Sequence, residues 1–171
     1  MNHPAKNLTL FALFLCLATV SMAQLKPKTA ACPDLTVDIL NGTINGQKSN
    51  TGGAEFKTVV PCSTGTEEDG PSAKCGGVIY YKDKDVSFYT QRKYFQIGPK
   101  FKGKMSLHVL GTPRNSLFKY LGNPKIKDAL WDAYETQYGT LVLHFTVAGQ
   151  AGRVCLIQMS TLGTDELSLC E

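Results

Sequence analysis

A short apolar helix that ends abruptly constrains the fold more than any other stretch of this chain. In "SLFKYLGNP" (116–124), Gly122 supplies a left-handed stop and Pro124 prevents continuation. A helix of six or seven residues is not stable alone, because nucleation costs too much. It must therefore lie against the strands that follow it. Its expected buried stripe is Leu117, Phe118 and Leu121, and its expected cap is Asn115 or Ser116.

The same order of segments occurs twice along the chain. In "AEFKTVV" (54–60) an earlier helix places Phe56, Val59 and Val60 at helical spacing, and Pro61 ends it. Alternating or continuous apolar runs separated by turn residues predict the strands. These strands are expected at 34–40, 77–82, 86–91 and 93–98, and then at 106–113, 130–135, 139–147 and 153–160. The stretch 41–53 reads as turns, and the tail at 165–171 as an edge strand.

This order predicts an α+β fold made of two tandem repeats. Each repeat is a strand, a short helix and a three-stranded antiparallel meander, a unit too small to bury its apolar face alone. Two such units side by side would form one sheet with the short helices on one face. The expected boundaries are 34–104 for the first repeat and 105–171, with its C-terminal tail, for the second.

The first 23 residues have the pattern of a signal peptide. Lys6 is followed by the apolar run 8–20, and "SMA" before Gln24 is a small-x-small cleavage site. Lipidation at Cys16 is disfavoured, because Leu15 stands where a small residue is normal. We therefore expect cleavage after Ala23, a flexible leader at 24–33, and a secreted or periplasmic protein.

Five cysteines remain after this cleavage, and export favours disulfides. Cys62 and Cys75 flank the polar loop "STGTEEDGPSAK", and a bond there would be worth about 3 kcal/mol. Cys155 lies inside a strand pattern and reads as a buried thiol. That leaves Cys32 with Cys170, although the sequence also allows Cys155 with Cys170.

Basic residues are concentrated in one segment, although the net charge of the chain is only +4. The segment 86–127 carries nine Lys and Arg residues and no Asp or Glu. It could attract anionic lipid or acidic glycan as a peripheral membrane contact. The alternation of Lys100, Lys102 and Lys104 in "KFKGK" is more typical of a solvated strand face. No motif indicates nucleic-acid binding.

The segment 110–124 resembles the opening of a known repeat. Gly111-Thr112, Leu117-Phe118 and the closing "LGNP" are similar to the repeat of beta-lactamase inhibitory proteins and of the small SmpA/OmlA-type outer-membrane assembly lipoproteins. Trp131, Tyr134, "YGTLVLHF" and "GRV" fit the strands that follow in that repeat. The similarity spans about 107–160, and the first half fits only in outline.

Two departures limit what the resemblance implies. The Met of the leading turn is absent, and no lipid-attachment cysteine is found. A disulfide in each repeat is a feature of the inhibitor proteins, and this chain supplies it clearly only in the first repeat. The resemblance implies an exported protein that inhibits or chaperones an envelope or secreted protein.

Catalysis is not expected. The sequence lacks a nucleophile elbow, a phosphate-binding glycine loop and the ligand spacings of a metal site, so no metal or cofactor is predicted. His108 and His144 both lie inside strand patterns. A thiol enzyme built on Cys155 and His144 is the third hypothesis, but their side chains are expected to point to opposite faces.

Aromatic residues on the strands indicate binding instead. Half of them should point away from the helices, and Tyr and Trp give binding energy at a low ordering cost. The alternative is a second buried layer, formed by a dimer or by the tail. We therefore expect a non-catalytic binding protein with a protein partner, or, as the second hypothesis, a structural envelope protein that binds lipid or glycan. The candidate binding residues are Tyr81, Tyr89, Tyr94, Trp131 and Tyr134, bordered by Lys102 and Lys104.

Overall fold

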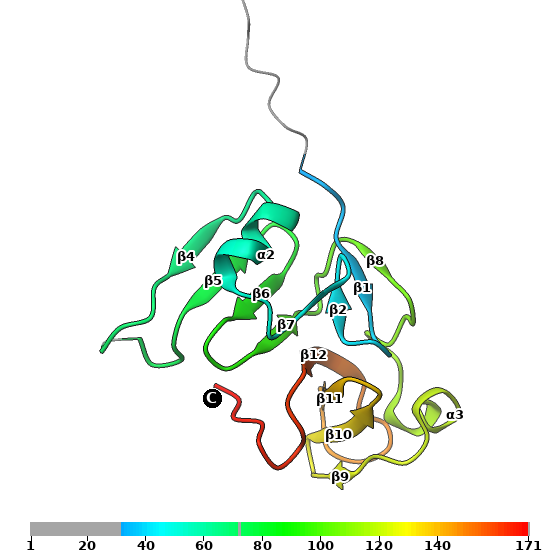
Figure 1. Ribbon diagram of the computed structural model, residues 1–171. Coiled ribbons are helices and arrows are strands. Elements are labelled where there is room, and N and C mark those ends of the chain that lie inside the picture. The colour runs from blue at the N-terminus through cyan, green and yellow to red at the C-terminus, as the bar shows by residue number, and fades with distance from the viewer. Residues whose placement is uncertain (1–31, 72, 171) are drawn as a thin grey trace, which may run out of the picture. The chain divides into compact units, whose positions relative to one another are not determined.

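Eight strands form one antiparallel sheet, with the strand order β4-β5-β6-β7-β12-β11-β10-β9 (Figure 1). The computed structural model describes residues 32–71 and 73–170, so the predicted signal peptide, and the leader up to residue 31, lie outside the described residues. The strands are β4 Gly65–Glu67, β5 Val78–Tyr81, β6 Val86–Tyr89, β7 Tyr94–Ile97, β9 Ile126–Lys127, β10 Trp131–Thr136, β11 Gly139–Phe145 and β12 Val154–Ser160.

The sheet is built from two meanders, β4 to β7 and β9 to β12. They join where β7 pairs with β12, which sets Phe95 opposite Met159 and Ile97 opposite Ile157. Helix α2 (Gly53–Val59) precedes the first meander. The 3₁₀ helix η1 (Arg114–Ser116) and helix α3 (Phe118–Leu121) precede the second. The predicted α+β class is confirmed, with short helices and a predominant sheet.

A second, small sheet was not expected. It contains β1 (Thr36–Asp38), β2 (Thr43–Ile44), β3 (Gln47–Lys48) and β8 (Lys104–Met105), in the order β3-β2-β1-β8. The strand predicted around Val37 is confirmed as β1, and the turn between β2 and β3 has Asn45 and Gly46 at φ values of 49° and 77°. The two-residue strands β2, β3 and β8 are too short to show alternation, so the sequence did not predict them. The strand predicted at 106–113 is wrong, because the pairing ends at Met105.

Phe56 fixes α2 on the sheet. Its ring is fully buried and lies 4.8 Å from Phe88 and 5.3 Å from Phe95, centroid to centroid. The Tyr81 hydroxyl donates to the Val60 carbonyl just beyond the helix, at 2.6 Å. Of the three apolar residues at helical spacing, Phe56 and Val60 are buried, whereas Val59 is 39% exposed. The core therefore lies on the face of the sheet that α2 and the small sheet cover.

The stripe predicted for α3 is only partly buried. Leu117 is fully buried and Leu121 packs against the core, but Phe118 is 63% exposed. Successive helical residues are about 100° apart around the axis, so Phe118 lies beside Leu117 on the helix surface and falls on its solvent side. No side chain caps either helix start, so the predicted cap is also wrong. Gly122 adopts the expected positive φ of 71°.

The disulfides join Cys32 to Cys62 and Cys75 to Cys170, with Cα–Cα distances of 5.8 and 5.5 Å. The predicted pairs, Cys62 with Cys75 and Cys32 with Cys170, are wrong. The loop between Cys62 and Cys75 contains β4, which pairs with β5 and places the two cysteines at opposite ends of the hairpin. Among residues 32–71 and 73–170, Cys155 is the free thiol, but it is half-buried rather than buried. It lies at the bulge where the β11–β12 register shifts.

Candidate functional site

The face of the sheet opposite the core is only partly accessible along its centre, where Gln96 and His144 are half-buried and Gln158 is 3% exposed. Because strand side chains alternate, Gln96 on β7 and Gln158 on β12 point away from Phe95 and Met159, and their Cα positions are paired. His144 on β11 lies on the same face, opposite Leu156. We call this side of the sheet the open face.

The C-terminal tail (161–170) forms one wall of the open face and is not the edge strand that was predicted. The disulfide to Cys75 fixes its end covalently. The Arg92 guanidinium donates to the carbonyls of Ser168 and Leu169 at 3.2 and 3.0 Å. Figure 1 shows the tail in red, leaving β12 as a coil. The tail is therefore a fixed part of the site.

A cavity of about 530 Å³ lies between the tail, the open face and the segment from β9 to β10. Its lining contains no Asp, Glu, Lys or Arg. The apolar residues of the lining are Ile126, Leu130, Trp131, Ala133, Val142, Leu156, Leu167 and Leu169, and the others are Gln96, Thr140, His144, Gln158, Thr164 and Cys170.

A row of hydrogen bonds crosses the floor of this cavity. The Nε2 atom of His144 lies 2.7 Å from Oε1 of Gln158, and the Gln158 amide nitrogen donates to Oε1 of Gln96 at 3.1 Å. With the Gln158 oxygen as acceptor, His144 Nε2 carries the proton. This tautomer leaves His144 Nδ1 as an acceptor, and the Gln96 amide nitrogen is a donor at the other end. The row thus offers hydrogen bonds of both kinds.

Two of the predicted binding tyrosines point into the core and not toward the open face. Tyr81 and Tyr134 are 2% and 4% exposed and belong to the core. Burial raises the pKa of each to about 12, and for Tyr134 the nearby Asp132 carboxylate adds to the effect. The prediction that they bind a partner at the open face is therefore wrong.

Tyr94 is on the open face, but the tail covers it. It is fully buried, its hydroxyl accepts from the Cys170 N–H at 3.1 Å, and Tyr89 stacks on its ring at 4.4 Å. Burial raises the pKa of Tyr94 to about 12. The tail layer considered as an alternative thus exists over this part of the face. Tyr89 is half-buried beside it.

Of the predicted binding residues, Trp131 alone lines the cavity. Lys102 and Lys104 are exposed at and before β8, in the small sheet, and are not among the lining residues. The structure therefore does not bring the predicted set together.

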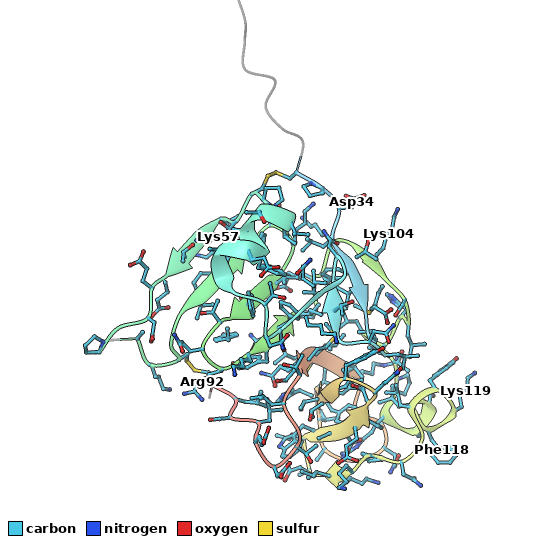
Figure 2. All side chains as sticks on the ribbon, in the orientation of Figure 1. Asp34, Lys57, Arg92, Lys104, Phe118 and Lys119 are labelled. Atoms are coloured by element: carbon cyan, nitrogen blue, oxygen red, sulfur yellow. A yellow bond between two sulfur atoms is a disulfide. The ribbon has the colours of Figure 1, made fainter. Side chains whose placement is uncertain are left out.

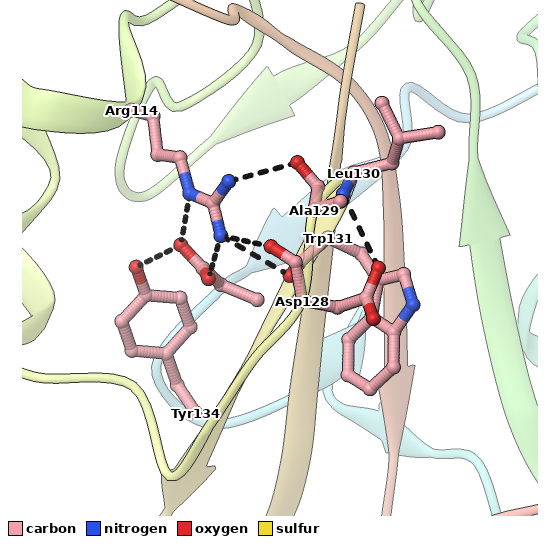
Figure 3. A network of polar contacts seen from close by, with 7 residues as sticks. Arg114, Asp128, Ala129, Leu130, Trp131 and Tyr134 are labelled. Carbon is pink, nitrogen blue, oxygen red and sulfur yellow. Dashed lines mark hydrogen bonds and ion pairs between the residues drawn. The ribbon is translucent and has the colours of Figure 1, made fainter. Parts of the chain in front are cut away.

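The basic segment 86–127 does not form one surface. Arg114 is buried and bonded to Asp132 (Figure 3), and Arg92 holds the tail. Lys104 and Lys119 project at separate places from the molecule in Figure 2. Lys125 pairs with Glu135 at 3.2 Å, with both side chains 57% exposed. Charge that is dispersed in this way gives little support to a lipid-binding or glycan-binding surface.

Cys155 does not form a thiol–imidazole pair with His144. Its Sγ atom contacts the backbone carbonyl of His144 at 3.5 Å, whereas the imidazole bonds to Gln158. Within residues 32–71 and 73–170, no cluster of three or more His, Cys, Asp or Glu side chains is placed to hold a metal ion. In the same residues, no helix has the length and apolar character needed to cross a membrane.

Sequence reasoning missed the glutamines of the floor. Gln96 and Gln158 each interrupt an apolar run, in "YFQIG" and "CLIQM", within strands that the sequence did predict. A polar residue in the middle of a central strand was the available signal. Comparison of the chain with family models, with curated proteins and with solved structures finds no match.

Proposed function

We propose that this chain is an exported, non-catalytic binding protein whose binding surface is the open face. The observation that carries the proposal is the cavity of about 530 Å³ between the tail and the floor residues Gln96, His144 and Gln158. Clefts of about 300–1,000 Å³, mostly apolar with a few placed polar groups, are typical of ligand sites.

The two disulfides support export, because such bonds persist mainly in oxidising compartments. The tail supports binding as the role of the face. It is held by the bond from Cys75 to Cys170 and by Arg92, so the site is formed before anything enters it. A site that needs no ordering retains more of its interaction energy as affinity.

The polar groups of the cavity favour recognition over catalysis. His144 and Gln158 are bonded to each other, and the nearest thiol, Cys155, contacts only the backbone of His144. A nucleophile with an adjacent base is the arrangement that covalent catalysis needs. The floor instead presents a fixed donor and a fixed acceptor.

The partner is a secreted or envelope component of the same compartment. The sequence resemblance to the tandem repeat of inhibitory proteins favours a binding role for the chain in that compartment. A helix followed by a meander in each half is the arrangement such a repeat requires.

Affinity capture with matched charge variants tests this function. The mature chain is immobilised, exposed to an envelope extract and compared with Leu156→Lys, which places a charge in the cavity. The control is Val147→Lys, the same type of change at a side chain that is 54% exposed and outside the cavity lining. We expect the component captured by the wild type to be retained by Val147→Lys and reduced at least tenfold by Leu156→Lys. Equal capture by both variants would reject the open face as the binding surface.

A further inference from the structure

We infer that the cavity binds a neutral, mainly apolar small molecule that carries one hydrogen-bonding group. The inference rests on the proposed function and names the chemistry of what enters the site. Four features of the cavity support it: its walls, its lack of charge, its polar floor and its fixed side.

The walls are apolar on opposite sides. Leu130 and Trp131 stand at the start of β10, and Leu167 and Leu169 belong to the tail. Leu156 lies on β12 between them. A planar or branched hydrocarbon body placed here would lose contact with water on both of its faces. Burial of apolar surface is then the main source of affinity.

The absence of carboxylate, ammonium and guanidinium groups from the lining disfavours an ionised ligand. None of the lining residues is Asp, Glu, Lys or Arg, so a carboxylate, phosphate or ammonium group would leave water without gaining an ionic partner. Burying an unpaired charge is strongly unfavourable. Arg92 is near the tail, but its guanidinium is occupied by backbone carbonyls.

The floor supplies the hydrogen-bonding partner. His144 Nδ1 can accept, and the Gln96 amide can donate, while the bonds of both residues to Gln158 fix their orientation. A hydroxyl, carbonyl or secondary amine at one end of an apolar molecule would therefore be held in place. A pure hydrocarbon would leave these groups without partners after water is displaced.

The tail favours a small molecule over a flat protein surface. A stable protein interface needs about 800 Å² on each partner. Here the tail buries Tyr94 and is joined covalently to Cys75, so part of the open face is already covered. The part of the open face that the tail leaves uncovered is a cavity with walls and not a flat surface.

Two fluorescent probes of one skeleton test the inference. N-phenyl-1-naphthylamine is neutral with a single N–H group, and 8-anilino-1-naphthalenesulfonate has the same rings with an added sulfonate. The protein has a single tryptophan, Trp131, and this residue lines the cavity, so its emission reports directly on occupancy. We expect the neutral probe to bind the oxidised mature chain one to one, to quench Trp131, and to bind at least tenfold more tightly than the sulfonate.

The charge variants also change which of the two probes binds more tightly, and this change of preference cannot result from loss of folding. Leu156→Lys should weaken the neutral probe at least tenfold and shift the preference toward the sulfonate, whereas Val147→Lys should bind both probes as the wild type does. The inference would be overturned if the sulfonate bound the wild type as tightly as the neutral probe or more tightly. It would also be overturned if Leu156→Lys bound the neutral probe with the affinity of the wild type. If component capture depends on the open face but the neutral probe does not bind, this inference fails and the proposed function stands. If capture is also independent of the open face, both fail.

Discussion

Arg114 and Asp132 form a buried ion pair, in which the Arg114 Nε–H donates to Asp132 Oδ2 at 2.9 Å (Figure 3). The guanidinium also donates to the carbonyls of Ala129 and Asp128 at 3.0 and 2.6 Å. Because its hydrogen bonds to Asp132 favour the charged form, the pKa of Arg114 is raised. The pair joins the segment before α3 to the first long strand of the second meander.

Breaking this pair should destabilise the protein strongly. Asp132→Ala leaves a buried guanidinium without its carboxylate, and such a loss typically costs about 3–5 kcal/mol. The measurement is the free energy of unfolding from denaturant titration. The matched control is Glu135→Ala, which breaks the exposed pair with Lys125 and should cost less than about 1 kcal/mol. Equal costs for the two variants would contradict the structural role of the buried pair.

Truncation of two residues that are adjacent in the sequence should change the free energy of unfolding by very different amounts. Leu117 is fully buried, so Leu117→Ala should cost about 2–5 kcal/mol through lost burial and a residual cavity. Phe118 is 63% exposed, so Phe118→Ala should change stability by less than about 0.5 kcal/mol. Thermal or denaturant unfolding distinguishes them. A larger loss for Phe118→Ala would mean that α3 is rotated from the orientation described here.

Removing the disulfide that joins the tail to Cys75 should destabilise the protein and release the tail from the open face. The bond from Cys75 to Cys170 closes 95 residues, and chain entropy assigns it about 4.7 kcal/mol, against about 3.6 kcal/mol for the 30-residue closure by Cys32 and Cys62. The double variant Cys75→Ser/Cys170→Ser should therefore lose more stability than Cys32→Ser/Cys62→Ser. It should also become sensitive to proteolysis in the tail. A tail that resists protease equally in both double variants would show that the disulfide does not hold it.

Ionisation of the buried tyrosines should lower the stability of the folded protein at alkaline pH. Burial raises the pKa of Tyr81, Tyr94 and Tyr134 to about 12, whereas the ordinary value is 10.0. The folded state therefore retains protons that the unfolded state releases, and this contribution is fully present below pH 10 and lost as the pH rises toward about 12. Absorbance of the phenolate measures ionisation, and Trp131 emission measures unfolding.

The expected result is incomplete ionisation of the seven tyrosines at pH 11 while the fold persists, with the remainder ionising near pH 12 or on unfolding. Tyr94→Phe should remove one of the late-titrating groups. Ionisation of all seven tyrosines at one midpoint near pH 10 in the folded protein would contradict the burial described here.

The long alternating segments predicted the fold well, because their apolar faces have to be buried. The strands from Val78 to Ile97 and from Trp131 to Ser160 follow the pattern of their residues, and so does the helix at Phe56. In the small sheet only β1 was predicted, since the two-residue strands β2, β3 and β8 leave no periodic signal. The predicted disulfides are wrong because the polar loop between Cys62 and Cys75 contains β4, which separates these two cysteines, and the pairing of Cys32 with Cys170 followed from that pair by elimination.

The site was predictable only in its general position. The predicted aromatic face is only partly present: Trp131 lines the cavity, but the tail covers Tyr94, and the orientation of each tyrosine depends on its place in the strand alternation. Tyr81 and Tyr80 are adjacent on β5 and therefore face opposite sides. The path of the tail could not be predicted either, because it is set by the bond between Cys75 and Cys170 and not by a local pattern.

The most direct test of the binding surface is a map of amide chemical shifts in the mature chain, with and without the component that the wild type captures. We expect the largest changes on the floor and the tail wall of the cavity, at Gln96, Val142, Leu156, Gln158 and Leu167. Changes centred on the exposed Phe118 and Tyr120 of α3, with the cavity residues unmoved, would contradict it.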